Sequence, residues 1–244
     1  MEEQYSVFVN AGAIVLLSRA LEEQEQQDVL HSLLLAQLVA NKKYPGFTLG
    51  DGWYETCQGV LKDSWLQRAV AWDSFGVDAD SKRAMLKWVE SQPQEPSDCM
   101  TIANVVGVIN DIARLPCTHP AVECLREKTL RHRIAELPDG SEVAETNVRL
   151  QIIVVEPGAV MNSLFVEFKT AGEASGHPLH PLFSSDKVSG NIQLRWFQAN
   201  LSSVLYASIR DAIARKLGDN AAKNIHSLFD DQPAKSPATT DVSP

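Results

Sequence analysis

The sequence predicts an α+β fold, with N-terminal helices packed on a mostly antiparallel meander sheet and a C-terminal amphipathic helix. Three observations lead to this prediction. Apolar residues recur at helical spacing in the first third of the chain, the apolar period changes from 3.6 to 2 at about residue 128, and the helical period returns after residue 201. Because the strands after this change do not alternate with helices, a parallel doubly wound fold is not expected.

Amphipathic helices are expected through the first third of the chain. Ile14, Leu17 and Leu21 form one apolar stripe at helical spacing, and a broader apolar face follows it. Residues 65 to 72 alternate in polarity, which is typical of a strand. The expected elements are helices over residues 10 to 21, 25 to 41 and 53 to 62, a loop over 42 to 52 and a strand over 65 to 72.

Two more helices and then the meander follow. Ser81 and Ser97 are candidate N-caps of these helices, and Pro116 ends the second one. Leu137-Pro138-Asp139-Gly140 is the strongest hairpin signal. The expected elements are helices over residues 82 to 91 and 98 to 115, and strands over 129 to 137, 146 to 158, 160 to 170 and 191 to 201.

The last predicted element is an amphipathic helix that Ser202 or Ser203 caps and Gly218 ends. Its predicted buried stripe is Leu205, Ile209, Ile213 and Leu217.

We expect one domain over residues 1 to 229, helix-rich up to residue 127 and sheet-rich from 128. Residues 230 to 244 have no hydrophobic periodicity, which predicts a disordered tail that can be removed without loss of folding.

Charge and hydropathy exclude several classes of function. The net charge of −9 argues against a nucleic-acid-binding protein, which gains affinity by neutralising phosphates with clustered Lys and Arg. The longest apolar run, residues 11 to 17, is too short for a constitutive membrane span of about 20 residues, whereas conditional membrane contact stays open. The acidic start MEEQYS lacks signal-peptide features and predicts cytoplasmic synthesis, with leaderless secretion as an open route.

No metal, cofactor or catalytic site is expected. The four cysteines have irregular spacing and are predicted to be reduced and buried. Cys117, His119, Cys124 and His132 are ligand types that zinc accepts, but they contain no C-x-x-C pair and His132 lies in a predicted strand. Because the sequence has no nucleophile elbow and no phosphate-binding glycine loop, we predict that the protein is not an enzyme.

Two other features allow alternative interpretations. The aromatic cluster of Trp53, Tyr54, Trp65, Trp72 and Trp88 is either a ligand platform or, more commonly for such residues, core between helix and sheet. Charge is asymmetric: six carboxylates and one arginine lie in residues 1 to 30, whereas cations predominate after residue 195. These charges either pair within the fold or give the protein a basic face for an anionic partner.

The segment from Gly172 to Ser189 is predicted to be a surface recognition loop, because it joins two strands and exceeds ordinary hairpin length. Histidines of ordinary pKa in such a loop would gain charge between about pH 7 and 5 and make contact pH-dependent. The residues predicted to bind a partner are His177, Leu179, His180 and Phe183.

Three stretches together, DVLHSLLLAQLVANKKY, WY at 53 and 54 and IRDAIARKLGDNAAKNI, resemble an uncharacterised group of microbial proteins without assigned function. The resemblance covers most of the chain and implies a common fold but no particular chemistry.

The predicted function is therefore that of a non-enzymatic bacterial factor that binds a protein partner or assembles with itself, including a virulence-associated one. The first alternative is a soluble, membrane-active, pore-forming toxin, in which helices move off long amphipathic strands that then insert. The predicted strands are long enough, since a spanning strand needs roughly ten residues. The second alternative is an enzyme of unrecognised type.

Overall fold

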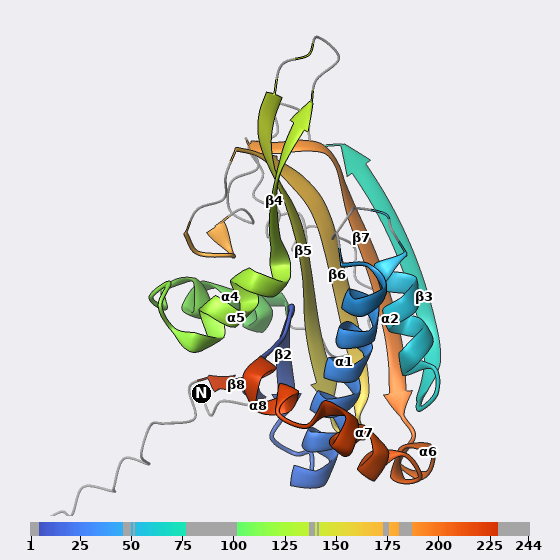
Figure 1. Cartoon of the computed structure of the whole chain (residues 1–244). Helices are drawn as coiled ribbons and strands as arrows, with labels where there is room; N and C mark the ends of the chain where they lie inside the picture. Colours follow the sequence, from blue (N-terminus) through green and yellow to red (C-terminus); the bar gives the residue numbers. More distant parts are fainter. Residues whose placement is uncertain are drawn as a thin grey trace, which may run out of the picture.

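Helices lie on both faces of one eight-stranded, mostly antiparallel sheet, which confirms the predicted α+β fold (Figure 1). The computed structural model describes residues 5–45, 50, 52–76, 102–136, 140, 142–172, 176–180 and 187–228, with side chains at 70–76 and 102–104 excepted. The predicted helix over 82 to 91, the caps Ser81 and Ser97, Phe183, and the tail over 230 to 244 lie outside these ranges.

The elements follow one another from β1 to β8. The strands are β1 (Tyr5–Asn10), β2 (Ala13–Ser18), β3 (Trp65–Gly76), β4 (Leu130–Glu136), β5 (Glu142–Glu156), β6 (Val160–Ala171), β7 (Val188–Leu201) and β8 (Ile225–Leu228). The helices are α1 (Glu23–Lys43), α2 (Trp53–Leu61), α4 (Ile102–Ala113), α5 (Pro120–Thr129), α6 (Ser203–Ala207), α7 (Arg210–Leu217) and α8 (Asn220–Asn224).

The strands are ordered β3-β7-β6-β5-β2-β1-β8, and β4 pairs with the first half of β5. The predicted meander forms the centre of this order, since β4, β5, β6 and β7 pair antiparallel with their neighbours. Two pairings join distant parts of the chain: β3 pairs with β7, and β2 lies parallel to β5.

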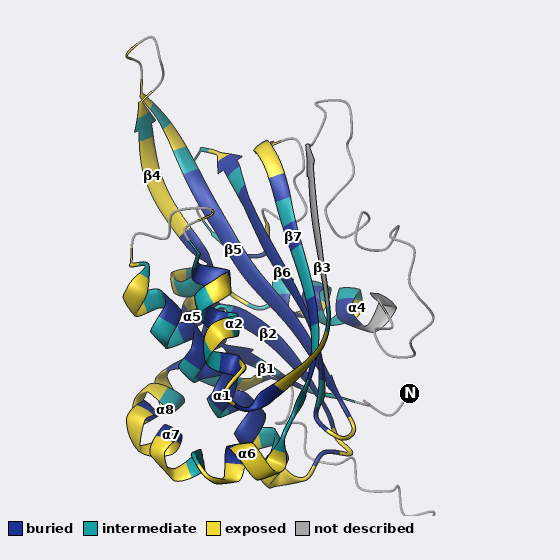
Figure 2. Ribbon diagram, turned by 90° about the vertical axis from the view of Figure 1, so that its right-hand side faces the viewer, coloured by how far each residue is buried: buried dark blue, intermediate teal, exposed yellow. Residues whose placement is uncertain are grey.

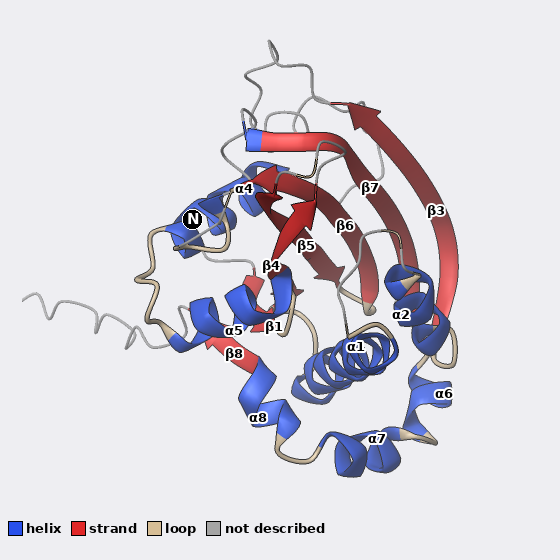
Figure 3. Cartoon of the chain, turned by 45° about the horizontal axis from the view of Figure 1, so that its top comes forward, coloured by secondary structure: helices blue, strands red, loops and turns tan. Residues whose placement is uncertain are grey.

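Two helical layers cover the sheet (Figure 3). One layer contains α1 and α2, which pack on one face through side chains such as Leu33 and Trp53. The other contains α4 and α5, which pack on the opposite face through Ile109 and Leu125. The C-terminal helices α6 to α8 add a third shell outside α1, because Leu34 packs against buried side chains of α6 and α7. Among the described helices, none is long and apolar enough to cross a membrane.

The helix predicted over residues 10 to 21 is wrong. This segment contains the end of β1 and all of β2, joined by a two-residue turn in which Ala11 has φ of 52°. Every side chain of β2 is buried because the strand lies inside the sheet with a helical layer on each face. A short run that is apolar on both sides has no period that separates helix from strand.

The prediction of a single C-terminal helix is also wrong. The chain breaks after α6 at Ala207 and begins again at Arg210, then adds α8 and β8, which the pattern did not predict. Ile213 and Leu217 are buried as expected, but the break leaves Leu205 44% exposed. The helix α5 was likewise missed.

Candidate functional site

The three long strands β5, β6 and β7 carry different chemistry on their two faces. The face under α4 and α5 is apolar across its centre and contributes to one continuous core. Its members are Val148, Leu150, Ile152 and Val154 of β5, Leu164, Val166 and Phe168 of β6, and Ile192 and Leu194 of β7. Polar pairs bound this band: Thr146 opposes Thr170 at one end, and Gln198 donates to Asn162 at 2.9 Å at the other.

The opposite face, under α1 and α2, combines apolar and charged side chains. Its apolar part includes Ile153, Phe165 and Phe197. Arg149 of β5 and Glu167 of β6 stand opposite each other in the register and form an ion pair of 3.0 Å, with each side chain 3% exposed. Burying both charges costs solvation, and the direct contacts between the two side chains offset only part of that cost.

The first turn of α2 and the loop before it cover this ion pair. The guanidinium of Arg149 lies 4.9 Å from the ring centroid of Trp53, and the Gly50 amide donates to Glu167 at 3.2 Å. Trp53 also stacks on Phe165 of β6, with ring centroids 5.7 Å apart.

A second cation, which belongs to β7, also contacts α2. Arg195 donates to Glu55 and lies 5.0 Å from the ring centroid of Tyr54. Burial is the main reason why the pKa of Tyr54 is raised, so its phenol stays protonated. The described members of the aromatic cluster, Trp53, Tyr54 and Trp65, are at most 6% exposed and therefore belong to the core. The side chains of Trp72 and Trp88 lie outside the described part.

Each helical layer comes from one stretch of the chain. Residues 23 to 61 give α1 and α2 between β2 and β3, and residues 102 to 129 give α4 and α5 before β4. A layer of this kind can separate from the sheet as a unit without cutting a strand out of its ladder. Movement of both layers would uncover a sheet with one face that is apolar at its centre and another that combines apolar and charged side chains.

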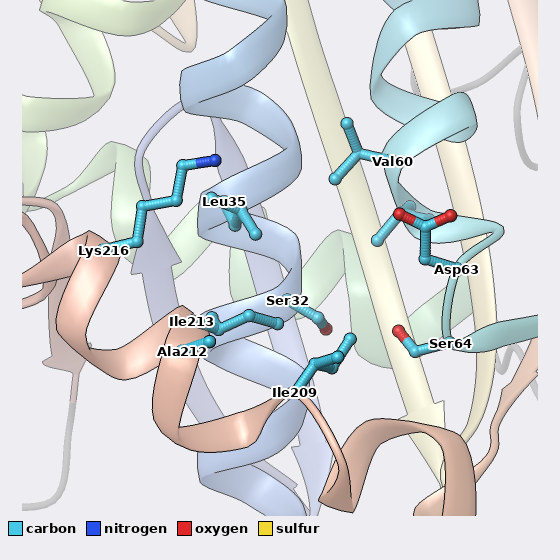
Figure 4. A pocket seen from close by; sticks show the side chains of 10 residues that line it. Ser32, Leu35, Val60, Asp63, Ser64, Ile209, Ala212, Ile213 and Lys216 are labelled. Carbon is cyan, nitrogen blue, oxygen red and sulfur yellow. The ribbon is translucent and has the colours of Figure 1, made fainter.

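A hollow of about 230 Å³ lies between α1, α2 and α7 (Figure 4). Leu35, Val60 and Ile213 give it apolar walls, and Lys216 and Asp63 stand on opposite sides of it. The other polar side chains in its lining are those of Ser32 and Ser64.

The predicted recognition loop is only partly at the surface. His177 and Leu179 are 3% and 1% exposed, which corrects the expectation that the segment is exposed throughout. Leu179 belongs to the core under α4 and α5, and the Leu179 amide donates to Nδ1 of His177. His180 is exposed, and its ring centroid lies 5.3 Å from that of His177. Partner binding by this loop stays a prediction.

The ordinary pKa expected for His177 is also corrected. Burial and the nearby His180 lower the pKa of His177, with a smaller effect of Arg126, while a hydrogen bond with the Ile112 backbone opposes the shift. His177 therefore gains charge at a lower pH than an exposed histidine does.

The four candidate zinc ligands serve separate local roles. His119 caps α5 by accepting from the Ala121 amide, and His132 hydrogen-bonds to Thr146. Cys124 is buried, but Cys117 is exposed on the turn before α5, which corrects its predicted burial. No cluster of three or more metal-ligating side chains occurs among the described residues.

Comparison with known proteins does not assign this chain to a family. No protein-family model matches the chain, and no curated protein matches it. A solved structure called delta-endotoxin is similar at a TM-score of 0.41 and 10% identity, over 79% of this chain and 82% of that one. A likeness at this level does not establish a shared activity.

Proposed function

We propose that this protein is a membrane-active toxin of the pore-forming kind, which holds its sheet covered until it meets a bilayer. The observation that carries the proposal is the two-faced chemistry of β5, β6 and β7: an apolar face beside a face with buried charges. Strands that cross a membrane alternate in this way, with apolar residues toward lipid and polar residues away from it.

Strand length supports the same proposal. β5, β6 and β7 have 15, 12 and 14 residues, whereas a tilted spanning strand needs roughly 9 to 11. The three strands are neighbours in the sheet and connected in sequence, so they can enter lipid as one unit.

The buried ion pair adds a reason for the helices to leave. Arg149 and Glu167 are desolvated while α2 covers them, and they regain water or polar contacts when it moves away. The apolar face is the counterpart, because lipid can replace α4 and α5 as its cover.

Dye release from liposomes tests the activity, and Cys57 reports on the movement. Cys57 is 2% exposed in α2, and burial raises the pKa of its thiol to about 12, so it should resist maleimide in buffer. Mixing with vesicles should release dye and make Cys57 reactive, as read by peptide mass spectrometry. The exposed Cys117 should label equally with and without vesicles and serves as the internal control.

Two results would contradict the proposal. Vesicles of every composition tested that retain their dye would exclude membrane permeabilisation. Dye release with Cys57 still protected would exclude separation of the α1 and α2 layer.

A second candidate, self-assembly, is the function first expected from the sequence, and one observation favours it. β4 pairs with β5 on one side, and Ile134 in this strand is 69% exposed. Strand edges bearing exposed apolar residues are sites where another chain can add a strand. Sedimentation of the wild type and of Ile134→Lys tests this: an oligomer that the substitution dissociates supports it, and a monomer in both cases excludes it.

A further inference from the structure

We propose that one corner of the molecule, formed by Leu66, Val204 and Leu205 and here called the docking corner, is the surface by which the protein first binds an anionic lipid membrane. The inference deepens the proposed membrane activity and rests on it. It names the face that meets the bilayer before any strand does.

The docking corner presents large apolar side chains to water. Val204, Leu66 and Leu205 are 80%, 55% and 44% exposed. Val204 and Leu205 lie in α6, a helix of five residues in which Tyr206 is the buried one. The helix breaks after Ala207, and α6 and α7 run in different directions (Figure 3), so Leu205 is exposed and not part of the buried stripe expected for it.

The three side chains belong to one end of the sheet. Trp65 pairs with Leu201, and the Ser202 amide donates to the Ser64 carbonyl at 2.9 Å, so the start of β3 and the start of α6 are tied together. Figures 1 and 2 show α6 beside the foot of β3 in two views. The opposite end carries β4, where Ile134 is exposed.

Charge at this corner differs in sign from the whole chain, which has a net charge of −9. Exposed cations outnumber exposed carboxylates on the segments that flank the corner. The cations are Lys62, Arg68, Arg215 and Lys216, and the carboxylates are Asp63 and Asp211. Apolar side chains with a basic surround fit a surface of anionic lipid, because anionic head groups attract the cations while the apolar groups enter the interface.

The hollow between α1, α2 and α7 is linked to α6, because the Ser64 carbonyl in its lining accepts from the Ser202 amide. Its lining includes Ser64 and Ile209, which flank α6 in the structure, and Lys216 at its rim. A lipid phosphate at Lys216 would therefore lie beside apolar walls.

The position of the corner fits the entry of the strands. β7 ends at Leu201 and β6 begins at Val160, which pairs with Asn200. Docking through α6 therefore brings these strand ends to the bilayer surface, with β5 joined to β6 by the turn at Gly158.

Flotation with vesicles tests the corner separately from dye release. The probes are vesicles of phosphatidylcholine alone and vesicles that also contain phosphatidylglycerol. The variants are Val204→Gln, the double variant Val204→Gln/Leu205→Gln, and the matched control Ile134→Gln, which removes an exposed apolar side chain at the far end. Glutamine keeps helix propensity and adds no charge.

The wild type should float with vesicles that contain phosphatidylglycerol, and more weakly with phosphatidylcholine alone. The double variant should lose about tenfold or more in partitioning, because two apolar side chains no longer enter the interface. Ile134→Gln should partition like the wild type, and all variants should melt within a few degrees of it. Arg215→Gln/Lys216→Gln should reduce flotation with vesicles that contain phosphatidylglycerol and leave flotation with phosphatidylcholine alone unchanged.

Three outcomes would overturn the inference. The double variant could float as well as the wild type, Ile134→Gln could lose as much, or the wild type could prove to be an oligomer that Val204→Gln dissociates while no vesicle is bound. Failure of the proposed function looks different: flotation lost in the double variant but no dye release by the wild type would keep the corner and exclude the toxin. Equal dye release by the wild type and the double variant would support the toxin and exclude the docking corner.

Discussion

Arg210 of α7 forms a bidentate pair with Asp28 of α1, through hydrogen bonds of 2.8 Å from Nε and 2.7 Å from Nη2. Asp28 is 4% exposed, so the pair fastens the C-terminal shell to the helix that covers the sheet. It is also one place where the asymmetric charge of the sequence is neutralised within the fold, since an acidic N-terminal residue meets a basic C-terminal one.

Arg210→Gln should therefore loosen the α1 layer. It leaves the buried Asp28 carboxylate without its bidentate partner, and we expect the melting temperature to fall by a few degrees and dye release to become faster. Calorimetry and a stopped-flow release assay measure the two effects. Arg215→Gln, in the same helix, is the control for stability, because Arg215 is exposed and bonds to a carbonyl of its own helix. Slower release by Arg210→Gln would contradict a fastening role.

Glu167→Gln should be among the most destabilising single changes in the sheet. It leaves the guanidinium of Arg149 buried without its carboxylate, which typically costs about 3 to 5 kcal/mol. Replacing both residues, as Arg149→Met/Glu167→Leu, should recover most of this loss because apolar side chains avoid the desolvation. Urea unfolding gives the free energies.

The exposed ion pair of Arg114 and Asp111 supplies the matched control for this experiment. Its side chains are 78% and 55% exposed, so Asp111→Asn should change the free energy of unfolding by less than about 1 kcal/mol. A Glu167→Gln variant as stable as Asp111→Asn would show that the buried pair contributes nothing.

Stability should fall as the pH drops below about 6.5, the ordinary histidine value. Burial lowers the pKa of His177 and that of His31, where the nearby Asp28 opposes the shift. The unfolded chain therefore takes up protons before the folded chain does, and the free energy of unfolding decreases as the pH falls. Urea unfolding at pH 7 and pH 5 measures the decrease, and His177→Asn should reduce it. An equal decrease in that variant would mean that His177 is not involved.

His177 and His180 should respond differently to alanine. His177 is buried beside the core, so His177→Ala should lower stability by about 1 to 3 kcal/mol, whereas the exposed His180→Ala should stay within about 0.5 kcal/mol. Weaker association of His180→Ala with a partner or with itself would support the recognition loop. Unchanged association together with unchanged stability would leave His180 as part of a connector.

Much of the architecture follows from local pattern. The long apolar face of α1, the alternation of β5, β6 and β7, and the hairpin between β4 and β5 were predictable because each depends on residues within a few positions of one another. The same alternation showed that long amphipathic strands exist. It did not show which face of each strand meets which helices.

Contacts between distant residues decided the rest. β2 became a strand because β5, more than a hundred residues away, accepts it in parallel, although its own apolar run fits a helix equally well. His177 is buried beside Leu179, which packs in the core shared with α4 and α5. The pairing of Arg149 with Glu167 and the exposure of Leu205 likewise depend on register and on a chain break. The sequence by itself determined the periodicity of the elements, and the tertiary structure determined which surfaces are covered, because burial is set by neighbours that local pattern does not contain.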